Sequence, residues 1–115
     1  MSDALRETLG GLAAIPGVRA ALAATASDGL PAATVAAFDV DADALAAFAT
    51  ALFKRTRLAN TSAGYGETRY LSLDAEQGRL FVATQGELAY VVLADRDASA
   101  GLVRVALQRA LRSVT

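Results

Sequence analysis

Apolar residues recur along this chain at two spacings, one typical of helices and one typical of strands. The first segment, residues 2–14, carries a row of leucines three or four residues apart, at Leu5, Leu9 and Leu12. This row predicts a helix with one apolar face. Ser2 or Asp3 is expected to cap the helix, and Pro16-Gly17 is expected to end it.

Two alanine-rich segments follow, residues 18–26 and 30–38. Alanine favours helix, but we predict strands. Pro16-Gly17 and Asp28-Gly29 confine the first segment to about ten residues, and Asp28-Gly29 is a strong signal for a tight hairpin turn. Alternate positions of the first strand should share one face: Val18, Ala20, Leu22 and Ala24.

The longest apolar periodicity follows an acidic run at residues 39–43. Asp41 or Asp43 is expected to cap a helix over residues 43–63, which ends at Gly64. One side of this helix carries Leu45, Ala49 and Leu52, with Phe48 and Phe53 on its flanks. The opposite side is also apolar, with Ala44, Ala47, Ala51 and Leu58. A helix that is apolar all round should be covered twice, here by a sheet and by a second protein chain.

Three more strands are predicted at residues 67–74, 79–85 and 88–94, separated by short turns. The last of them is apolar almost throughout, as expected for a central strand covered on both faces. Asp95-Arg96-Asp97 is expected to cap a final helix, residues 98–113. The order helix, two strands, helix, three strands, helix predicts an α+β fold, with helices against the faces of one five-stranded antiparallel sheet.

Composition narrows the function more than it narrows the fold. The chain has 115 residues, which predicts one domain over residues 1–115, and its 54% hydrophobic and 20% charged content argues against disorder. The net charge of −1 argues against nucleic-acid binding. Cysteine and histidine are absent, which excludes disulfides, zinc fingers and Ser-His-Asp catalysis. We expect a cytoplasmic protein that is not an enzyme, with no cofactor, no bound metal and no membrane span.

Two motifs suggest ligand binding, and each has a simpler explanation. Asp39-Val40-Asp41-Ala42-Asp43 begins like a calcium loop, but Ala44 and Thr50 stand where that loop needs glycine and glutamate, so helix capping is favoured. Gly64-Tyr65-Gly66 begins like a dinucleotide-binding motif, but Arg69 occupies the third glycine position and no helix follows. We interpret those glycines as a helix stop and a turn.

Three further features leave two interpretations open. Lys54-Arg55-Thr56-Arg57 either binds phosphate, anionic lipid or an acidic partner, or is a solvated helix end, since its three charges fan around the helix. Arg96 is either an arginine finger or a partner in a local ion pair with Asp95 or Asp97. Tyr65 and Tyr70, which flank the third strand, suit either a half-buried interface or ordinary sheet packing.

Three motifs together suggest a family. They are Ile15-Pro16-Gly17-Val18-Arg19-Ala20-Ala21-Leu22, Ser27-Asp28-Gly29-Leu30-Pro31 and Leu93-Ala94-Asp95-Arg96-Asp97-Ala98-Ser99-Ala100-Gly101-Leu102-Val103-Arg104. In their order and spacing, over nearly the whole chain, the sequence resembles the roadblock (dynein light chain) family, most closely its short bacterial members of the MglB type. The resemblance implies a profilin-like three-layer sandwich that forms a homodimer through its middle helix and third strand.

Members of this family typically act on Ras-like small GTPases, as activators of hydrolysis, scaffolds or membrane recruiters. The resemblance therefore implies a homodimeric regulator or scaffold of a bacterial Ras-like GTPase, bound through paired middle helices. It places Lys54, Arg55 and Arg57 on the GTPase-facing surface. It places in the dimer interface Ala44, Ala47, Phe48, Ala51, Leu58, Tyr70, Leu71 and Ser72. The alternatives are a small-molecule sensing domain and a structural adaptor with no GTPase partner.

Overall fold

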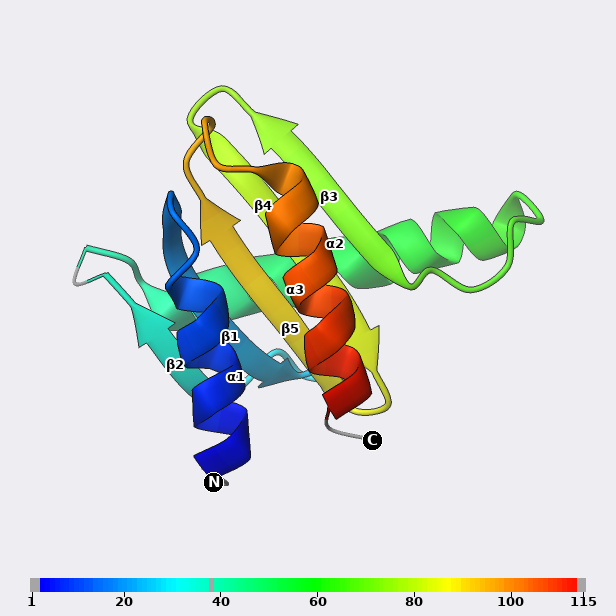
Figure 1. Cartoon of the computed structure of the whole chain (residues 1–115). Helices are drawn as coiled ribbons and strands as arrows, with labels where there is room; N and C mark the ends of the chain where they lie inside the picture. The colour runs from blue at the N-terminus through cyan, green and yellow to red at the C-terminus, as the bar shows by residue number, and fades with distance from the viewer. Residues whose placement is uncertain (1–2, 38, 114–115) are drawn as a thin grey trace.

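A five-stranded antiparallel sheet with helices on both faces makes up the part of the chain described by this computed structural model, residues 3–37 and 39–113 (Figure 1). The elements are α1 (Asp3–Ala13), β1 (Val18–Thr25), β2 (Pro31–Ala36), α2 (Ala42–Ser62), β3 (Tyr70–Ala75), β4 (Gly78–Gln85), β5 (Leu88–Ala94) and α3 (Ala100–Ser113). The sheet order is β2-β1-β5-β4-β3. The predicted α+β class and the predicted order of elements are confirmed.

The central strands β1 and β5 are buried on both faces. Ala20, Leu22 and Ala24 on β1 and Val91 and Val92 on β5 have no solvent exposure. Small alanine side chains in β1 allow the helix layers to pack closely on both faces of the sheet. This close packing accounts for a strand made of residues with low strand propensity. The nearly continuous apolar run of β5 was correctly interpreted as a strand covered on both faces.

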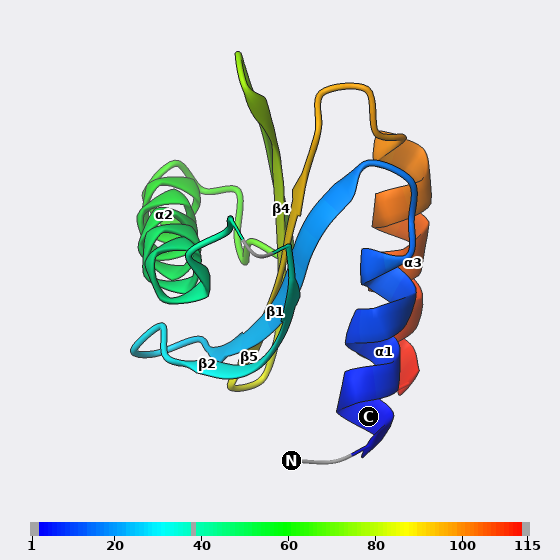
Figure 2. The same cartoon turned by 90° about the vertical axis from the view of Figure 1, so that its left-hand side faces the viewer.

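Two hydrophobic cores lie on the two faces of the sheet, as Figure 2 shows: α2 covers one face, and α1 and α3 cover the other. The core under α2 contains Leu22, Phe53 and Val82. The core under α1 and α3 contains Leu9, Leu12, Phe81, Tyr90, Val92 and Leu107. The three layers are therefore a pair of helices, a sheet and a single helix.

One expectation about β1 is wrong: Val18 does not share a face with Leu22 and Ala24. The pairing of β1 with β5 shifts register between Val18 and Ala20, which is a β-bulge. An extra residue reverses the alternation of side chains beyond it. Val18 therefore packs on the core under α1 and α3, while Leu22 and Ala24 pack under α2.

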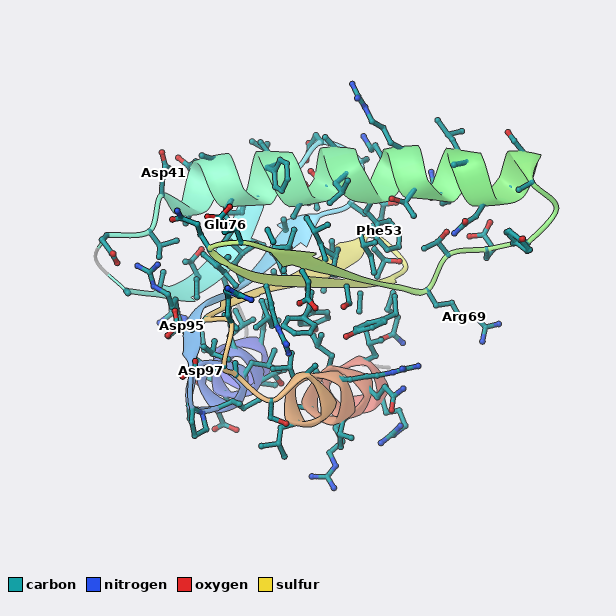
Figure 3. The ribbon with its side chains drawn as sticks, turned by 90° about the horizontal axis from the view of Figure 1, so that it is seen from above. Asp41, Phe53, Arg69, Glu76, Asp95 and Asp97 are labelled. Atoms are coloured by element: carbon teal, nitrogen blue, oxygen red, sulfur yellow. The ribbon has the colours of Figure 1, made fainter. Side chains whose placement is uncertain are left out.

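An aspartate side chain caps the start of α2. Asp41 accepts a hydrogen bond from the backbone N–H of Ala44 at 3.1 Å, so Asp41, and not Asp43, is the N-cap. The sheet-facing side is buried at Ala46, Ala49, Thr50 and Phe53. Of the two flanking phenylalanines, Phe53 points to the sheet (Figure 3), whereas Phe48 is 55% exposed.

The third strand starts at Tyr70, three residues later than predicted. Gly64 and Gly66 both have positive φ angles, at 84° and 86°, and turn the chain after α2. Thr68 then accepts a 2.7 Å hydrogen bond from the Asn60 side chain, which ties this segment to α2. Residues 67–69 therefore do not continue the ladder with β4, whose pairing with β3 begins at Tyr70 and Ala83.

The last helix starts at Ala100, two residues later than predicted, and its cap is different. Leu102 N–H donates to the Ser99 hydroxyl oxygen at 3.2 Å, so Ser99, and not the acidic run at residues 95–97, satisfies the helix start. Ala98 is buried against Gly17, where a Cβ would lie only 2.8 Å from the Ala98 Cβ. Ala98 precedes α3 and packs against the turn at Gly17.

The remaining boundary predictions are nearly correct. α1 and β2 are slightly shorter than predicted, and Ser2 and Phe38 lie outside the described residues. The pair Gly10-Gly11 does not interrupt α1, which runs to Ala13. Across residues 3–37 and 39–113, no helix has the length and hydropathy needed to span a bilayer. The expected cytoplasmic location stays a prediction.

Candidate protein-interaction surface

The outward face of α2 is apolar and open to solvent. Ala44, Ala47, Phe48, Ala51 and Leu58 are all exposed, with exposed fractions of 55% for Phe48 and 66% for Leu58. α2 lies alone on its side of the sheet (Figure 2), so nothing in the described part of the chain covers this face. Exposed large apolar side chains gathered on one face are typical of an interaction surface.

The spacing of these residues makes a continuous stripe along α2. Ala44, Phe48, Ala51, Arg55 and Leu58 follow one another at alternating steps of four and three residues. This alternation keeps side chains on one side of a helix and is the spacing of a coiled-coil seam. Arg55, expected on a GTPase-facing surface, therefore lies in line with the predicted dimer residues.

The three basic residues of α2 do not form one cluster. The Lys54 ammonium donates a hydrogen bond to the Ser27 carbonyl oxygen, which ties α2 to the turn between β1 and β2. Arg55 and Arg57 are exposed, and at about 100° per residue their side chains leave the helix in nearly opposite directions. The expectation that these charges fan around the helix is confirmed.

The β3 strand forms the second part of the candidate surface. Among the residues that the structure describes, β3 is an edge strand that pairs only with β4, so the opposite edge of its backbone is open there. Leu71 packs toward the core under α2. Tyr70 packs on the other face, under the Arg104 guanidinium, which lies 5.2 Å from the ring centre, and Ser72 is exposed. Burial raises the pKa of Tyr70, and Arg104 and Ser72 partly offset this effect.

A shallow hollow of about 310 Å³ beside Phe48 joins α2 to the β3–β4 hairpin. Its walls include Leu45, Leu73 and Leu93, and Leu73 is 37% exposed. Leu73 was missed in the sequence prediction of the interface. Its position two residues after Leu71 was the available signal, because alternate residues of a strand share a face. The hollow extends the apolar surface of α2 toward the β3 edge.

Structural roles account for two of the other candidate motifs. Asp39 forms an ion pair with Arg19, and Asp41 caps α2, in agreement with the capping interpretation of the acidic run. In the described residues, no group of three or more acidic side chains is placed to hold a metal ion. Gly64 and Gly66 form the turn after α2, as interpreted.

Arg96 is exposed and makes no ion pair with Asp95 or Asp97 in the described part of the chain, so the expected local pair is wrong. These loop residues lie at the end of the molecule where the β3–β4 turn carries Glu76 (Figure 3). Arg79 makes the ion pair of this region, from its Nε to Asp74 Oδ1 at 2.9 Å. Tyr65 is 83% exposed in the turn after α2.

The arrangement of α2, the sheet and the α1–α3 pair is that of a known domain family. The sequence pattern of the Roadblock/LC7 domain family matches residues 5–95. The chain therefore belongs to the Roadblock/LC7 domain family. A relative in the archaeon Methanocaldococcus jannaschii, an uncharacterised protein, is 30% identical over 87 residues, which cover 76% of each chain.

Solved structures share the fold over nearly the whole chain. A Roadblock/LC7 domain from Streptomyces avermitilis superposes with a TM-score of 0.84 at 26% identity, covering 94% of this chain and 92% of that one. The gliding protein MglB from Thermus thermophilus superposes with a TM-score of 0.83 at 21% identity, covering 99% and 90%. Profilin II of Acanthamoeba castellanii gives a TM-score of 0.61 at 18% identity, covering 96% and 92%. The predicted profilin-like roadblock fold is confirmed.

Proposed function

We propose that this chain is a homodimeric regulator or scaffold of a Ras-like small GTPase. The observation that carries the proposal is the exposed apolar stripe of α2, since a lone domain gains no stabilisation from apolar surface that it leaves in water. Membership of the Roadblock/LC7 family and a fold shared with the gliding protein MglB support the assignment. The chain would act by binding and not as an enzyme.

The stripe predicts how two copies meet. Ala44, Phe48, Ala51, Arg55, Leu58 and Ser62 are spaced symmetrically about the middle of the stripe. In an antiparallel pair of α2 helices, Phe48 then packs against Leu58 of the partner subunit, and Arg55 packs beside the partner's Ala51. The small alanine leaves room for the arginine side chain, and we place the β3 strands, each at the edge of its sheet, at the same seam. The dimer interface thus comprises the α2 stripe with Ala47, together with Tyr70, Leu71 and Ser72.

A disulfide test checks this register, because the wild-type chain has no cysteine. The double variant Phe48→Cys/Leu58→Cys should form a covalent dimer on mild oxidation. Residues ten apart on one helix are separated by about 15 Å, so a bridge within one copy is impossible. The single variants Phe48→Cys and Leu58→Cys are the matched controls and should stay uncrosslinked. A strict monomer in light scattering at micromolar concentration would overturn the dimer.

The regulatory part rests on differential binding. A protein that binds one nucleotide state of a GTPase more tightly shifts the population toward that state. Stimulated hydrolysis would further require that the dimer hold the catalytic groups of the GTPase in a reactive geometry. We place the contact on the paired α2 helices and their exposed basic residues: Arg55 within the stripe, and Lys54 and Arg57 on other sides of the helix.

The experiment compares a Ras-like GTPase from the same genome loaded with GDP and with a non-hydrolysable GTP analogue. We expect affinities that differ between the two states by at least fivefold, and a changed rate of GTP hydrolysis if the chain is an activator. Arg57→Glu should weaken binding without changing the dimer mass. Equal affinity for both states would refute the regulator and leave a scaffold of the GTPase. No binding to any such GTPase would refute the GTPase assignment and leave the structural adaptor.

A further inference from the structure

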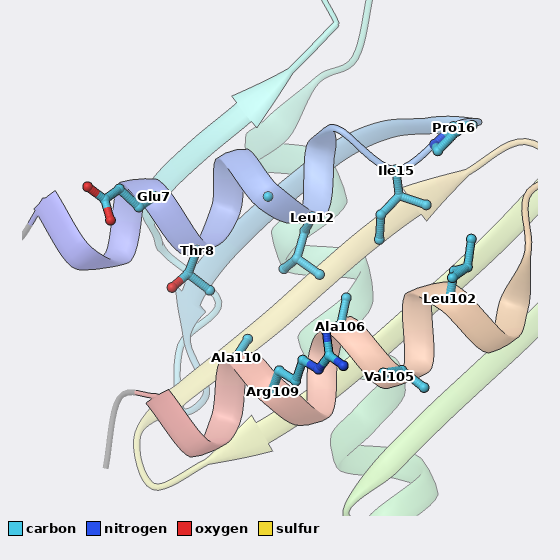
Figure 4. A pocket seen from close by; sticks show the side chains of 11 residues that line it. Glu7, Thr8, Leu12, Ile15, Pro16, Leu102, Val105, Ala106, Arg109 and Ala110 are labelled. Atoms are coloured by element: carbon cyan, nitrogen blue, oxygen red, sulfur yellow. The ribbon is translucent and has the colours of Figure 1, made fainter.

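A groove runs between α1 and α3, on the face of the sheet opposite α2 (Figures 2 and 4). It encloses about 420 Å³. Leu12 and Ala106 lie deep in it, whereas Leu102 and Val105 on its α3 side are 57% and 46% exposed. Two large apolar side chains exposed beside a concave surface are more than the packing of this fold requires.

The groove changes character along its length (Figure 4). One end is apolar, with Ile15 and Pro16 facing Leu102. The other end is charged, with Glu7 on the α1 wall and Arg109 on the α3 wall. Neither charge makes an ion pair with another described residue, so both are available to a ligand.

The α1 wall is lowered by a glycine that the fold itself does not need. Gly11 lies in a regular helix without a positive φ, and a Cβ built on it would meet nothing within 4 Å. Glycine is the weakest helix former after proline, and the rest of the chain uses alanine freely at such positions. Without a side chain at residue 11, another backbone can approach α1 closely.

We propose that this groove binds a short amphipathic α-helix of a partner protein. A groove between two helices offers no open strand edge, so an extended peptide has no backbone to pair with, whereas an apolar helix face fits between two parallel walls. The 11 residues of α1 set a length of about 16 Å, or three helical turns.

Charge complementarity sets the sequence of that helix. Leu102 and Arg109 are seven residues apart, which is about 10 Å or two turns along α3. A helix lying beside α3 would place a bulky apolar residue against Leu102 and an acidic residue seven positions away, against Arg109. Its other flank would carry a basic or amide residue against Glu7. An anionic membrane is disfavoured, because the site is concave and carries a carboxylate.

A displayed library of 14-residue amphipathic helices tests the proposal, with flank positions that vary among Glu, Gln and Lys. Selection on the wild-type protein should enrich Glu at the position seven residues from the apolar anchor. Binding of the enriched peptides should fall at least tenfold in Gly11→Gln, where the new side chain fills the groove. Arg109→Glu should reverse the preference to Lys, by about two- to fivefold, as for an exposed ion pair.

Gly10→Gln is the matched control. Gly10 also has nothing within 4 Å of a built Cβ, but its side chain would leave α1 about 100° away from that of Gly11 and does not line the groove. This variant should bind within twofold of wild type, and both variants should melt at or above the wild-type temperature, because glutamine is the better helix former.

The proposal is overturned if no peptide is enriched, or if enriched peptides bind Gly11→Gln and Arg109→Glu as well as wild type. It is also overturned if vesicles rich in phosphatidylglycerol bind the wild-type protein but do not bind the Val105→Glu variant, because the patch would then be a lipid-binding surface. The dimer and GTPase experiments use the opposite face of the sheet, so their outcomes are independent of this one.

Discussion

Gly29 lies so close to Thr50 that a Cβ atom at residue 29 would be 2.5 Å from the Thr50 hydroxyl oxygen. The Thr50 hydroxyl donates a 2.8 Å hydrogen bond to the Ala46 carbonyl oxygen within α2, so it is held in place by that helix. Gly29 has a φ of 72°, in the turn between β1 and β2. This contact seats α2 on the β1–β2 hairpin.

Gly29→Ala is therefore expected to lower the free energy of unfolding by about 2–4 kcal/mol, from the positive φ and the overpacking together. Gly64→Ala is the matched control, because Gly64 has a φ of 84° but nothing within 4 Å of a built Cβ. It should cost only about 1 kcal/mol. Urea unfolding measures both, and equal losses would show that the contact with Thr50 contributes nothing.

The two phenylalanines of α2 should behave differently. Phe53 is 5% exposed in the core under α2, so Phe53→Ala should lower the free energy of unfolding by about 3–5 kcal/mol. Phe48→Ala should change the intrinsic stability of the subunit by less than about 0.5 kcal/mol and instead weaken self-association. Unfolding and sedimentation at several protein concentrations separate the two effects. A Phe48→Ala protein that associates like wild type would remove Phe48 from the interface.

The cap of α2 can be tested with neighbouring aspartates. Asp41→Ala removes the acceptor for the Ala44 N–H and should lower the free energy of unfolding by about 1 kcal/mol. Asp43→Ala, in the first turn of α2, removes only a favourable interaction with the helix dipole and should cost about 0.5 kcal/mol or less. Thermal unfolding compares the two, and a larger loss at Asp43 would contradict the assigned cap.

The β1–β2 turn should contribute to acid sensitivity. Hydrogen bonds from the Thr25 hydroxyl and, at 3.2 Å, from the Leu30 N–H lower the pKa of Asp28 below its ordinary value of 3.8. A carboxyl whose pKa is lower in the folded state stabilises the fold above its unfolded pKa, and that stability is lost as the pH falls through the folded pKa. Thr25→Val should raise the pKa of Asp28 in a carboxyl NMR titration. An unchanged pKa would show that the Thr25 bond is not its cause.

The Tyr90 hydroxyl is buried without a hydrogen-bond partner among the described residues. A buried polar group without a partner is unfavourable, so Tyr90→Phe should leave the free energy of unfolding unchanged or raise it by up to about 1 kcal/mol. Burial also raises the pKa of Tyr90. A group whose pKa is raised in the folded state favours folding while it is protonated, and this contribution is lost as the pH rises through the raised pKa. Wild type should therefore lose stability above pH 10 more steeply than Tyr90→Phe. A clear loss of stability at pH 7 in Tyr90→Phe would contradict this account.

The interaction surface was only partly predictable from the sequence. The apolar character of α2 on every side was evident, because helical spacing alone places Ala44, Ala51 and Leu58 on one face. The centre of the buried face of α2 was less evident from the sequence. The predicted buried face lies around Ala49 and Leu52, and the observed one, around Ala46 and Phe53, is rotated from it by about one residue. The angle at which α2 meets the sheet sets that rotation, and helical spacing does not determine it.

The sequence by itself determined the number, type and order of the elements, because turn residues such as Pro16-Gly17 and Asp28-Gly29 act on the residues next to them. The tertiary structure alone decided that Val18 faces away from Leu22, that Ala98 packs against Gly17 ahead of α3, and that Glu7 and Arg109 line the two walls of one groove. Each of these depends on segments distant along the chain, whose contacts form only when the sheet pairs and the helices pack on it. The local spacing of apolar and polar residues therefore does not predict such contacts.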